Sequence, residues 1–271
     1  NVSMPGFWNV GTGRSIEPVS LAEIKTAENI QMKKENISVL LYKNFAVVKG
    51  QYEMLNTSTK AIRVEIGYPE HGIFYNKEVE NVVFNELKEL KVAINDKETT
   101  FVTKKSELSK SNLNEWYIWS VNFAPKTTTK ITVYYLVDTS FAILKKGYSS
   151  ISGNGFAYIL ESGKVLKNKI GEGTVTIKLM DDLTEENLFN ITPSKLQYDE
   201  TNQALVYNFK NLEPEHDDNI VIRYRKIKTG YNFESITKEA LMYYQEVDKL
   251  DTLKIDKNNL KNLEKDDFKA S

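Results

Sequence analysis

Short stretches in which apolar and polar residues alternate recur along most of this 271-residue chain. Two of them are residues 62–68, Ile-Arg-Val-Glu-Ile-Gly-Tyr, and residues 117–123, Tyr-Ile-Trp-Ser-Val-Asn-Phe. Successive side chains of a β-strand point to opposite faces, so a period of two is typical of a strand with one buried face. The stretches follow one another at roughly ten-residue spacing without long helical segments between them. This spacing favours antiparallel sheets over a βαβ arrangement.

The same reasoning predicts strands along most of the chain and one helix near its end. Further strands are expected at residues 45–56, 90–94, 131–137, 156–160, 175–179, 205–209 and 220–224. Asn95-Asp96 predicts a hairpin turn. A helical period begins near Ser235, with apolar residues at 236, 240, 243, 247 and 250. The chain is therefore expected to be mainly β, as two antiparallel β-sandwich-like units or one extended sandwich, with a C-terminal helix.

A change of composition near the middle of the chain predicts a domain boundary. Residues 145–155 are rich in Lys, Gly and Ser, a composition that is common in linkers and equally in long loops within one domain. We expect an N-terminal β-sandwich domain at 1–147, a second β domain at 148–232, and a C-terminal helix with a charged tail at 233–271.

The overall composition excludes several classes of protein. With 41% hydrophobic and 27% charged residues, the chain is an ordinary globular protein and not a disordered one. Its formal net charge of -1 lacks the basic excess with which proteins neutralise nucleic-acid phosphates, so no nucleic-acid partner is expected. There is no cysteine, which excludes disulfides and thiolate chemistry. No apolar run approaches the roughly 20 residues of a membrane-spanning helix.

No motif in the sequence indicates catalysis, a metal or a cofactor. The two histidines, His71 and His216, are fewer than a zinc site needs, and His71 lies in a turn-like Tyr-Pro-Glu-His-Gly segment. Four carboxylates crowd residues 213–218. They could bind calcium, but the spacing is not that of an EF-hand, and a solvated acidic turn explains them as well. We assign no catalytic residue, metal or cofactor.

Aromatic residues are the most suggestive feature. In Trp116-Tyr-Ile-Trp119, a β-strand places Trp116 and Trp119 on opposite faces. One face belongs to the core, and the other is either covered by a neighbouring unit or exposed. An exposed indole can stack on a sugar ring or a partner side chain. Trp116 and Trp119 are therefore the candidate ligand-binding residues.

Several segments together resemble a known family. The runs Lys34-Glu-Asn-Ile-Ser-Val39, Ala46-Val-Val-Lys-Gly-Gln-Tyr-Glu-Met-Leu-Asn56 and Gly67-Tyr-Pro69 are similar to an exported bacterial domain family of unknown function. Residues 116–125, 158–163 with 170–171, and 212–224 fit the same pattern, so the resemblance covers about residues 30–225. It implies a β-rich fold and a location in the cell envelope, and it carries over no site residue.

These observations lead to a functional expectation. We expect an extracytoplasmic binding or structural module with no identifiable catalytic site, whose partner is a protein or glycan of the cell envelope. The chain begins at Asn1 and not at a methionine, as it would after removal of a leader, although an artificially trimmed end would look the same. The alternative is a carbohydrate-active hydrolase that uses a carboxylate pair on a β-sandwich. Oligomeric state does not follow from the sequence.

Overall fold

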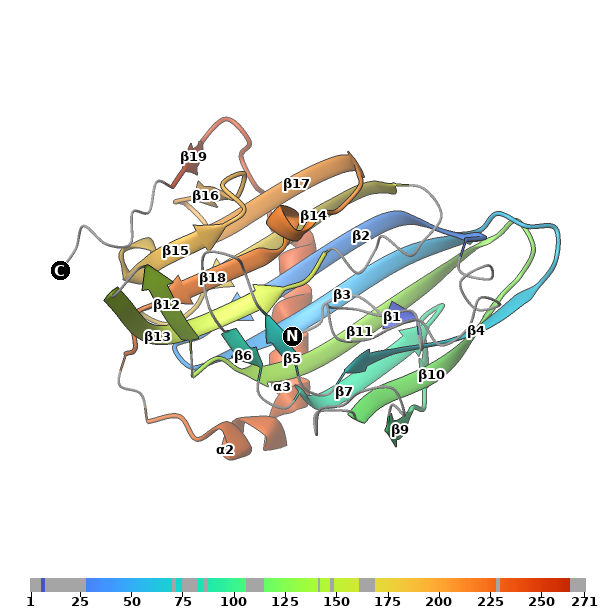
Figure 1. The fold of residues 1–271 in the computed structure, drawn as a ribbon, viewed down its shortest axis with the longest axis horizontal. Coiled ribbons are helices and arrows are strands. Elements are labelled where there is room, and N and C mark those ends of the chain that lie inside the picture. The colour runs from blue at the N-terminus through green and yellow to red at the C-terminus, as the bar shows by residue number, and fades with distance from the viewer. Residues whose placement is uncertain are drawn as a thin grey trace.

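The computed structural model describes residues 6–7, 28–69, 72–74, 82–84, 87–105, 115–140, 142–146, 149–160, 169–227 and 230–263. These residues form three β-sheets (Figure 1). A broad nine-stranded sheet makes one layer, and two smaller sheets lie side by side against one of its faces. A C-terminal helix crosses its other face. We call the face toward the smaller sheets the inner face and the face under the helix the outer face.

The nine-stranded sheet has the order β19-β16-β17-β14-β2-β3-β11-β7-β8. Its strands, in chain order, are β2 (Ile30–Leu41), β3 (Phe45–Asn56), β7 (Leu87–Ile94), β8 (Lys97–Thr99), β11 (Thr128–Asp138), β14 (Ile170–Leu179), β16 (Gln197–Asp199), β17 (Ala204–Leu212) and β19 (Leu260–Asn262). All of its pairs are antiparallel except β14 with β2, which is parallel. This parallel pair joins the strands before residue 147 to those after it in one continuous sheet.

The two smaller sheets are antiparallel. The four-stranded sheet consists of β1 (Gly6–Phe7), β4 (Ile62–Pro69), β10 (Glu115–Phe123) and β9 (Val102–Lys105) in that order. The six-stranded sheet consists of β15 (Leu188–Thr192), β18 (Ile220–Tyr224), β13 (Ser149–Tyr158), β12 (Ala142–Lys146), β6 (Val82–Phe84) and β5 (Gly72–Phe74) in that order. Short 3-10 turns lie at η2 (Glu185–Asn187), η3 (His216–Asp218) and η4 (Lys249–Thr252).

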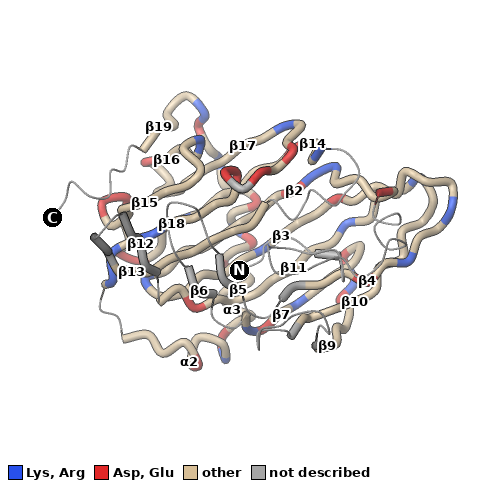
Figure 2. The backbone as a smooth tube through the Cα atoms, in the orientation of Figure 1, with Lys and Arg blue, Asp and Glu red and all other residues tan. Residues whose placement is uncertain are grey.

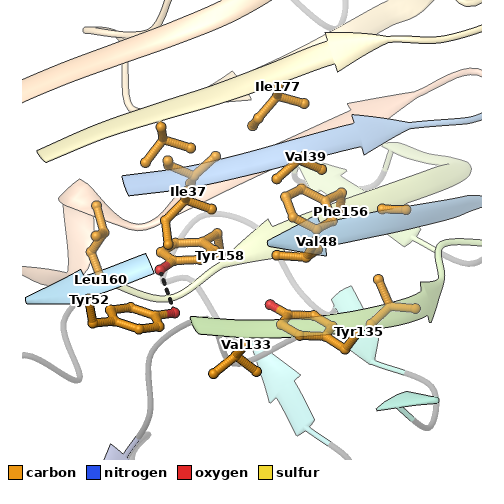
Figure 3. Packing of buried hydrophobic residues seen from close by; sticks show 14 of the residues in the cluster. Ile37, Val39, Val48, Tyr52, Val133, Tyr135, Phe156, Tyr158, Leu160 and Ile177 are labelled. Atoms are coloured by element: carbon orange, nitrogen blue, oxygen red, sulfur yellow. Dashed lines mark hydrogen bonds between the residues drawn. The ribbon is translucent and has the colours of Figure 1, made fainter. Parts of the chain in front are cut away.

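One hydrophobic core fills the space between the large sheet and both smaller sheets. It combines inner-face residues such as Val39 and Val133 with Trp119 of β10 and Phe156 of β13, all almost fully buried. Figure 3 shows aliphatic side chains interleaved with the rings of Tyr52, Tyr135 and Tyr158. The ring of Tyr52 lies over Gly50, where an added Cβ would come 2.3 Å from the Tyr52 hydroxyl. Glycine at position 50 therefore makes room for this ring.

The C-terminal segment covers a second, smaller core on the outer face. The helices are α2 (Phe233–Lys238), capped by the Asn232 side chain, and α3 (Ala240–Asp248). Tyr244, Val247 and Leu250 pack with Leu40, Val47 and Leu136 of the sheet. β19 then pairs with β16 at the edge of the sheet. Neither α2 nor α3 has the length and run of apolar residues that a bilayer crossing requires.

The mainly β fold with a C-terminal helix is confirmed. The expected strand at 45–56 is β3 with the same ends, and Asn95 and Asp96 form the expected hairpin turn with positive φ angles of 49° and 63°. Two details differ. The predicted helix is interrupted at Glu239, between α2 and α3, and the β2–β14 pair is parallel. The predicted division into domains at residues 147 and 232 stays a prediction. Strands from both sides of residue 147 belong to the nine-stranded sheet.

Candidate functional site

The strand register places a polar surface on the outer face beside α3. Lys49 of β3 lies opposite Tyr134 of β11, and Tyr134 lies opposite Lys91 of β7. One step further along the strands, Gln51 lies opposite Thr132, and Thr132 opposite Ala93. On β3 this face changes from apolar Val47, under the helix, to polar residues beyond it. Of the described elements, α3 packs over the apolar half of this face and borders the polar half.

This surface and the flank of α3 enclose a groove with a volume of about 520 Å³. Its floor consists of the six residues paired above, with Lys130 and Asp96 at one end; the six are Lys49, Gln51, Tyr134, Thr132, Lys91 and Ala93. Leu241, Tyr244, Gln245 and Asp248 of α3, with Asp251, form its wall. A volume of this size is in the range of pockets that take small molecules.

Lys49 is the most constrained side chain of the groove. It is 4% exposed, and its ammonium lies 2.5 Å from Asp248 Oδ1 and 2.7 Å from Asp251 Oδ2. Burial by itself lowers the pKa of Lys49, but the hydrogen bonds to the two aspartates outweigh it, and the pKa is raised overall. Lys49 therefore stays charged and ties the end of α3 to the sheet.

Two tyrosines stand next to this ion-pair group. The Tyr134 hydroxyl donates to Asp248 Oδ1 at 2.8 Å, and the Lys49 ammonium lies 5.5 Å from the centre of the Tyr134 ring. Burial, and then the bond to Asp248, raise the pKa of Tyr134 to about 12. Tyr134 therefore stays a neutral hydroxyl at neutral pH. Its ring lies 5.1 Å from that of Tyr244, centre to centre.

A bulge in β7 fixes the wall of the groove. The register between β11 and β7 shifts after Tyr134, and Glu89 has a φ of 55°. A bulge leaves a carbonyl outside the ladder and turns it away from the neighbouring strand. Here the Glu89 carbonyl accepts a hydrogen bond from the Tyr244 hydroxyl. Tyr244, and with it the first half of α3, is thereby held above the floor.

The charges of the groove are balanced. Lys130 pairs with Asp96 at 3.0 Å and Lys91 with Glu98 at 3.2 Å, in addition to the Lys49 group. Figure 2 likewise shows acidic and basic residues interspersed along the strands and not gathered by sign. The groove thus offers amides, hydroxyls and balanced ion pairs, an arrangement that suits a polar ligand without a large net charge.

The structure places both candidate tryptophans in the interior. Trp119 is 2% exposed and belongs to the main core, and Trp116, on the other face of β10, is 3% exposed. Ile118, on the same face as Trp116, is 1% exposed. Of the two alternatives for the second face of this strand, covered or exposed, the structure shows the covered one, because Trp116 and Ile118 are buried as well. Ligand binding by Trp116 and Trp119 stays a prediction, and neither residue lines the groove.

Of the other residues considered from sequence as site residues, none that the structure describes lines the groove. His71 is outside the described residues, and His216 begins the η3 turn. Asp218 of the acidic loop accepts hydrogen bonds from the Tyr207 hydroxyl at 3.3 Å and the Glu215 amide at 3.0 Å, which gives it a structural role. Within the described ranges, no group of three or more His, Asp or Glu is arranged to hold a metal ion. The hydrolase alternative stays a prediction.

Sequence reasoning did not find the groove residues. Lys49 and Gln51 alternate with buried residues in β3 as any exposed strand residue does, and Asp248 is one of many C-terminal acids. One signal was present in the sequence: along one face of β3 the residues change from apolar Phe45 and Val47 to polar Lys49 and Gln51. This change marks the end of the apolar surface that another element must cover, but it does not identify that element.

The chain was compared with known proteins. No family model matches it, and no curated protein matches it. Among solved structures, it is similar to the crystal structure of a "putative nutrient binding protein" from Legionella pneumophila subsp. pneumophila str. Philadelphia 1. That similarity has a TM-score of 0.51 and 14% identity, and covers 73% of this chain and 68% of that chain. At this identity it shows a shared fold.

A second solved structure is an M1 zinc metallopeptidase from Deinococcus radiodurans. Its TM-score is 0.37 with 8% identity, and the match covers 72% of this chain and 42% of that chain. The present chain therefore spans less than half of the peptidase, and a likeness at this level supports no conclusion about its role.

Proposed function

We propose that this protein is an extracytoplasmic binding module that holds a polar ligand of low net charge in the groove between α3 and the outer face of the large sheet. The observation that carries the proposal is the groove itself. Gln51 and Thr132 on its floor and Gln245 on its wall provide uncharged donors and acceptors, while the lysines beside them are already neutralised by acids.

The groove is also prepared for binding. Lys49 with its two aspartates, and the Tyr244 bond to Glu89, fix floor and wall relative to each other without a ligand. A site that is formed in advance loses less conformational entropy when a ligand arrives. The exposed Leu241 side chain at the rim adds apolar surface for the non-polar face of such a ligand.

The location and the partner belong to the proposal as well. The resemblance of residues 30–225 to an exported bacterial family supports a place in the cell envelope. A nutrient-binding name for the Legionella protein of the same fold is compatible with a binding role here. The envelope ligand would be a small nutrient or part of a glycan.

The test is a thermal-shift screen with sugars, amino acids and short peptides. A ligand present at 100 times its Kd stabilises the native state by about 2.7 kcal/mol, which raises the Tm of a chain of this size by roughly 5–10 °C. We expect at least one compound to raise the Tm of the wild type by this amount. The same compound should not raise the Tm of the Gln51→Leu variant.

Gln31→Leu is the matched control, because Gln31 is a partly exposed glutamine near the start of β2. It should keep the full shift. A ligand that stabilises the wild type and both variants equally would show that binding occurs away from the groove.

A further inference from the structure

A row of uncharged polar side chains continues from the groove across the outer face. The register sets Thr132 of β11 opposite Gln51 of β3, and Gln51 opposite Asn36 of β2. Asn36 in turn lies opposite Thr174 of β14, and Thr174 opposite Asn208 of β17. We call these five residues the amide–hydroxyl row. It crosses five adjacent strands at right angles to their direction, and its first two members line the groove.

The side chains of the row are exposed to solvent to different degrees. Asn208 is exposed, Thr174, Asn36 and Gln51 are partly exposed, and Thr132 is buried at the floor of the groove. Thr174 donates a hydrogen bond to Asn208 Oδ1 at 3.0 Å, which orients that amide. Amides and hydroxyls carry both donors and acceptors, so the four exposed or partly exposed positions of the row can exchange hydrogen bonds with a neutral polyhydroxylated chain.

The two neighbouring rows define the edges of this strip. On the side of α3, Thr176, Ser38 and Lys49 are 8%, 8% and 4% exposed. On the far side, the residues alternate in sign from strand to strand, in the order Lys210, Glu172, Lys34, Glu53 and Lys130. Opposite charges on adjacent strands neutralise one another. The strip therefore has no single-sign field to attract an anionic polymer such as nucleic acid.

The repeat of the row matches the repeat of a sugar chain. Neighbouring strands are about 4.8 Å apart, so five strands place their side chains over roughly 19 Å. One pyranose unit of an extended β-1,4-linked glycan has nearly the length of one strand spacing. An extended peptide that binds by β-augmentation, by contrast, adds to an edge of the sheet along the strand direction.

We propose that the amide–hydroxyl row is an extended subsite for an uncharged β-1,4-linked glycan, which lies across the strands with one end in the groove. The inference rests on the proposed function and adds the chemical class and the length of the ligand. Each strand from β11 to β17 would contact about one sugar unit, so the site takes a chain of about five units.

The experiment is isothermal titration of the full chain with β-1,4-linked oligomers of N-acetylglucosamine and of glucose, from dimer to hexamer. A net hydrogen bond or two per unit corresponds to an affinity gain of about three- to tenfold for each added unit. We expect this gain in at least one series up to the pentamer and little beyond it. Asn36→Ala and Thr174→Ala should reduce the ratio of hexamer to dimer affinity toward one. Asn258→Ala, an exposed loop amide, is the matched control and should keep the wild-type ratio.

The possible failures are distinguishable. Equal affinity for dimer and hexamer would contradict the proposal of an extended subsite, while the proposal that a ligand binds in the groove would stand. If neither series binds while an amino acid or peptide binds in a way that depends on Gln51, the glycan is wrong and the proposed function stands. If no compound shows dependence on Gln51, both proposals are wrong.

Discussion

Glu35 is a carboxyl group with almost no polar surroundings. It is fully buried on the inner face of β2, and the Tyr158 hydroxyl donates to its Oε1 at 2.6 Å. The Tyr52 and Tyr158 hydroxyls lie 3.4 Å apart, as Figure 3 shows. Among the described residues, Oε2 has no hydrogen-bond partner. Burial raises the pKa of Glu35 from 4.5 to about 7, against the opposing effect of the Tyr158 bond.

This raised pKa makes stability depend on pH. Between pH 4.5 and 7 the native state keeps a proton that the unfolded chain releases, so the free energy of unfolding falls as pH rises through this window and is constant on either side. We expect Glu35→Gln, which is neutral and can still accept from Tyr158, to be more stable than the wild type at pH 8 by about 3 kcal/mol. The two proteins should differ little at pH 4.5. Urea denaturation at both pH values measures this, and a difference independent of pH would contradict the raised pKa.

At the scale of elements, α3 is held to the sheet by both apolar packing and one buried charge. Val247 and Leu250 pack on Leu40 and Val47, while Lys49 binds two acids from the end of the helix and the turn after it. The packing could be anticipated from the helical period near Ser235. The ion pairs could not be anticipated, because Lys49 is separated from Asp248 by 199 residues and from Asp251 by 202 residues in the chain.

We expect Lys49→Met to weaken the docking of α3. Without the ammonium, two carboxylates remain beside each other at the edge of an apolar contact, so the free energy of unfolding should fall by about 2 kcal/mol. The amides of residues 240–248 should exchange faster with solvent, as hydrogen-exchange mass spectrometry can measure. The matched control is Lys91→Met, whose partner Glu98 is exposed and which should change stability by less than about 1 kcal/mol. Equal effects of the two substitutions would show that the buried pairs do not fix the helix.

The strands were predictable to very different degrees. β3 and β11 were easily predicted as strands, because apolar residues recur at every second position along one face of each. β2, at the centre of the large sheet, was not among the strands expected from periodicity. Lys33, Lys34 and Glu35 form a charged run within its first half. A register shift lies between Met32 and Lys34, and residues 37–41 are buried on both faces. A buried acid and a bulge remove the period of two that would have revealed this strand.

The whole molecule is organised by a large sheet whose two faces are covered to different extents. The inner face packs on the smaller sheets, whereas among the described elements it is α3 that crosses the outer face. The mainly β class follows from local patterns, but this asymmetry follows from the order of strands that are distant in sequence. The groove and the amide–hydroxyl row both result from it, which is why no short motif could indicate them.

The C-terminal segment is therefore expected to be part of the folded unit. A chain ending at Tyr231 would expose Phe45, Val47, Leu40 and Leu136, at an expected loss of roughly 5 kcal/mol or more of stability. It should bind the dye ANS and aggregate, whereas a chain ending at Leu263, which keeps every described element, should melt like the full protein. Equal melting temperatures for the two truncated chains would show that the outer face does not need its cover.

The most direct test of the central claim is an amide NMR titration of the full chain with the tightest-binding compound of the thermal-shift screen. Binding in the groove predicts shift changes on β3 and β11 around Gln51 and Thr132 and on α3 around Gln245. It also predicts that the indole signals of Trp116 and Trp119 stay unchanged. Changes that centre on those indoles, with α3 unaffected, would contradict the groove and place the ligand at β10.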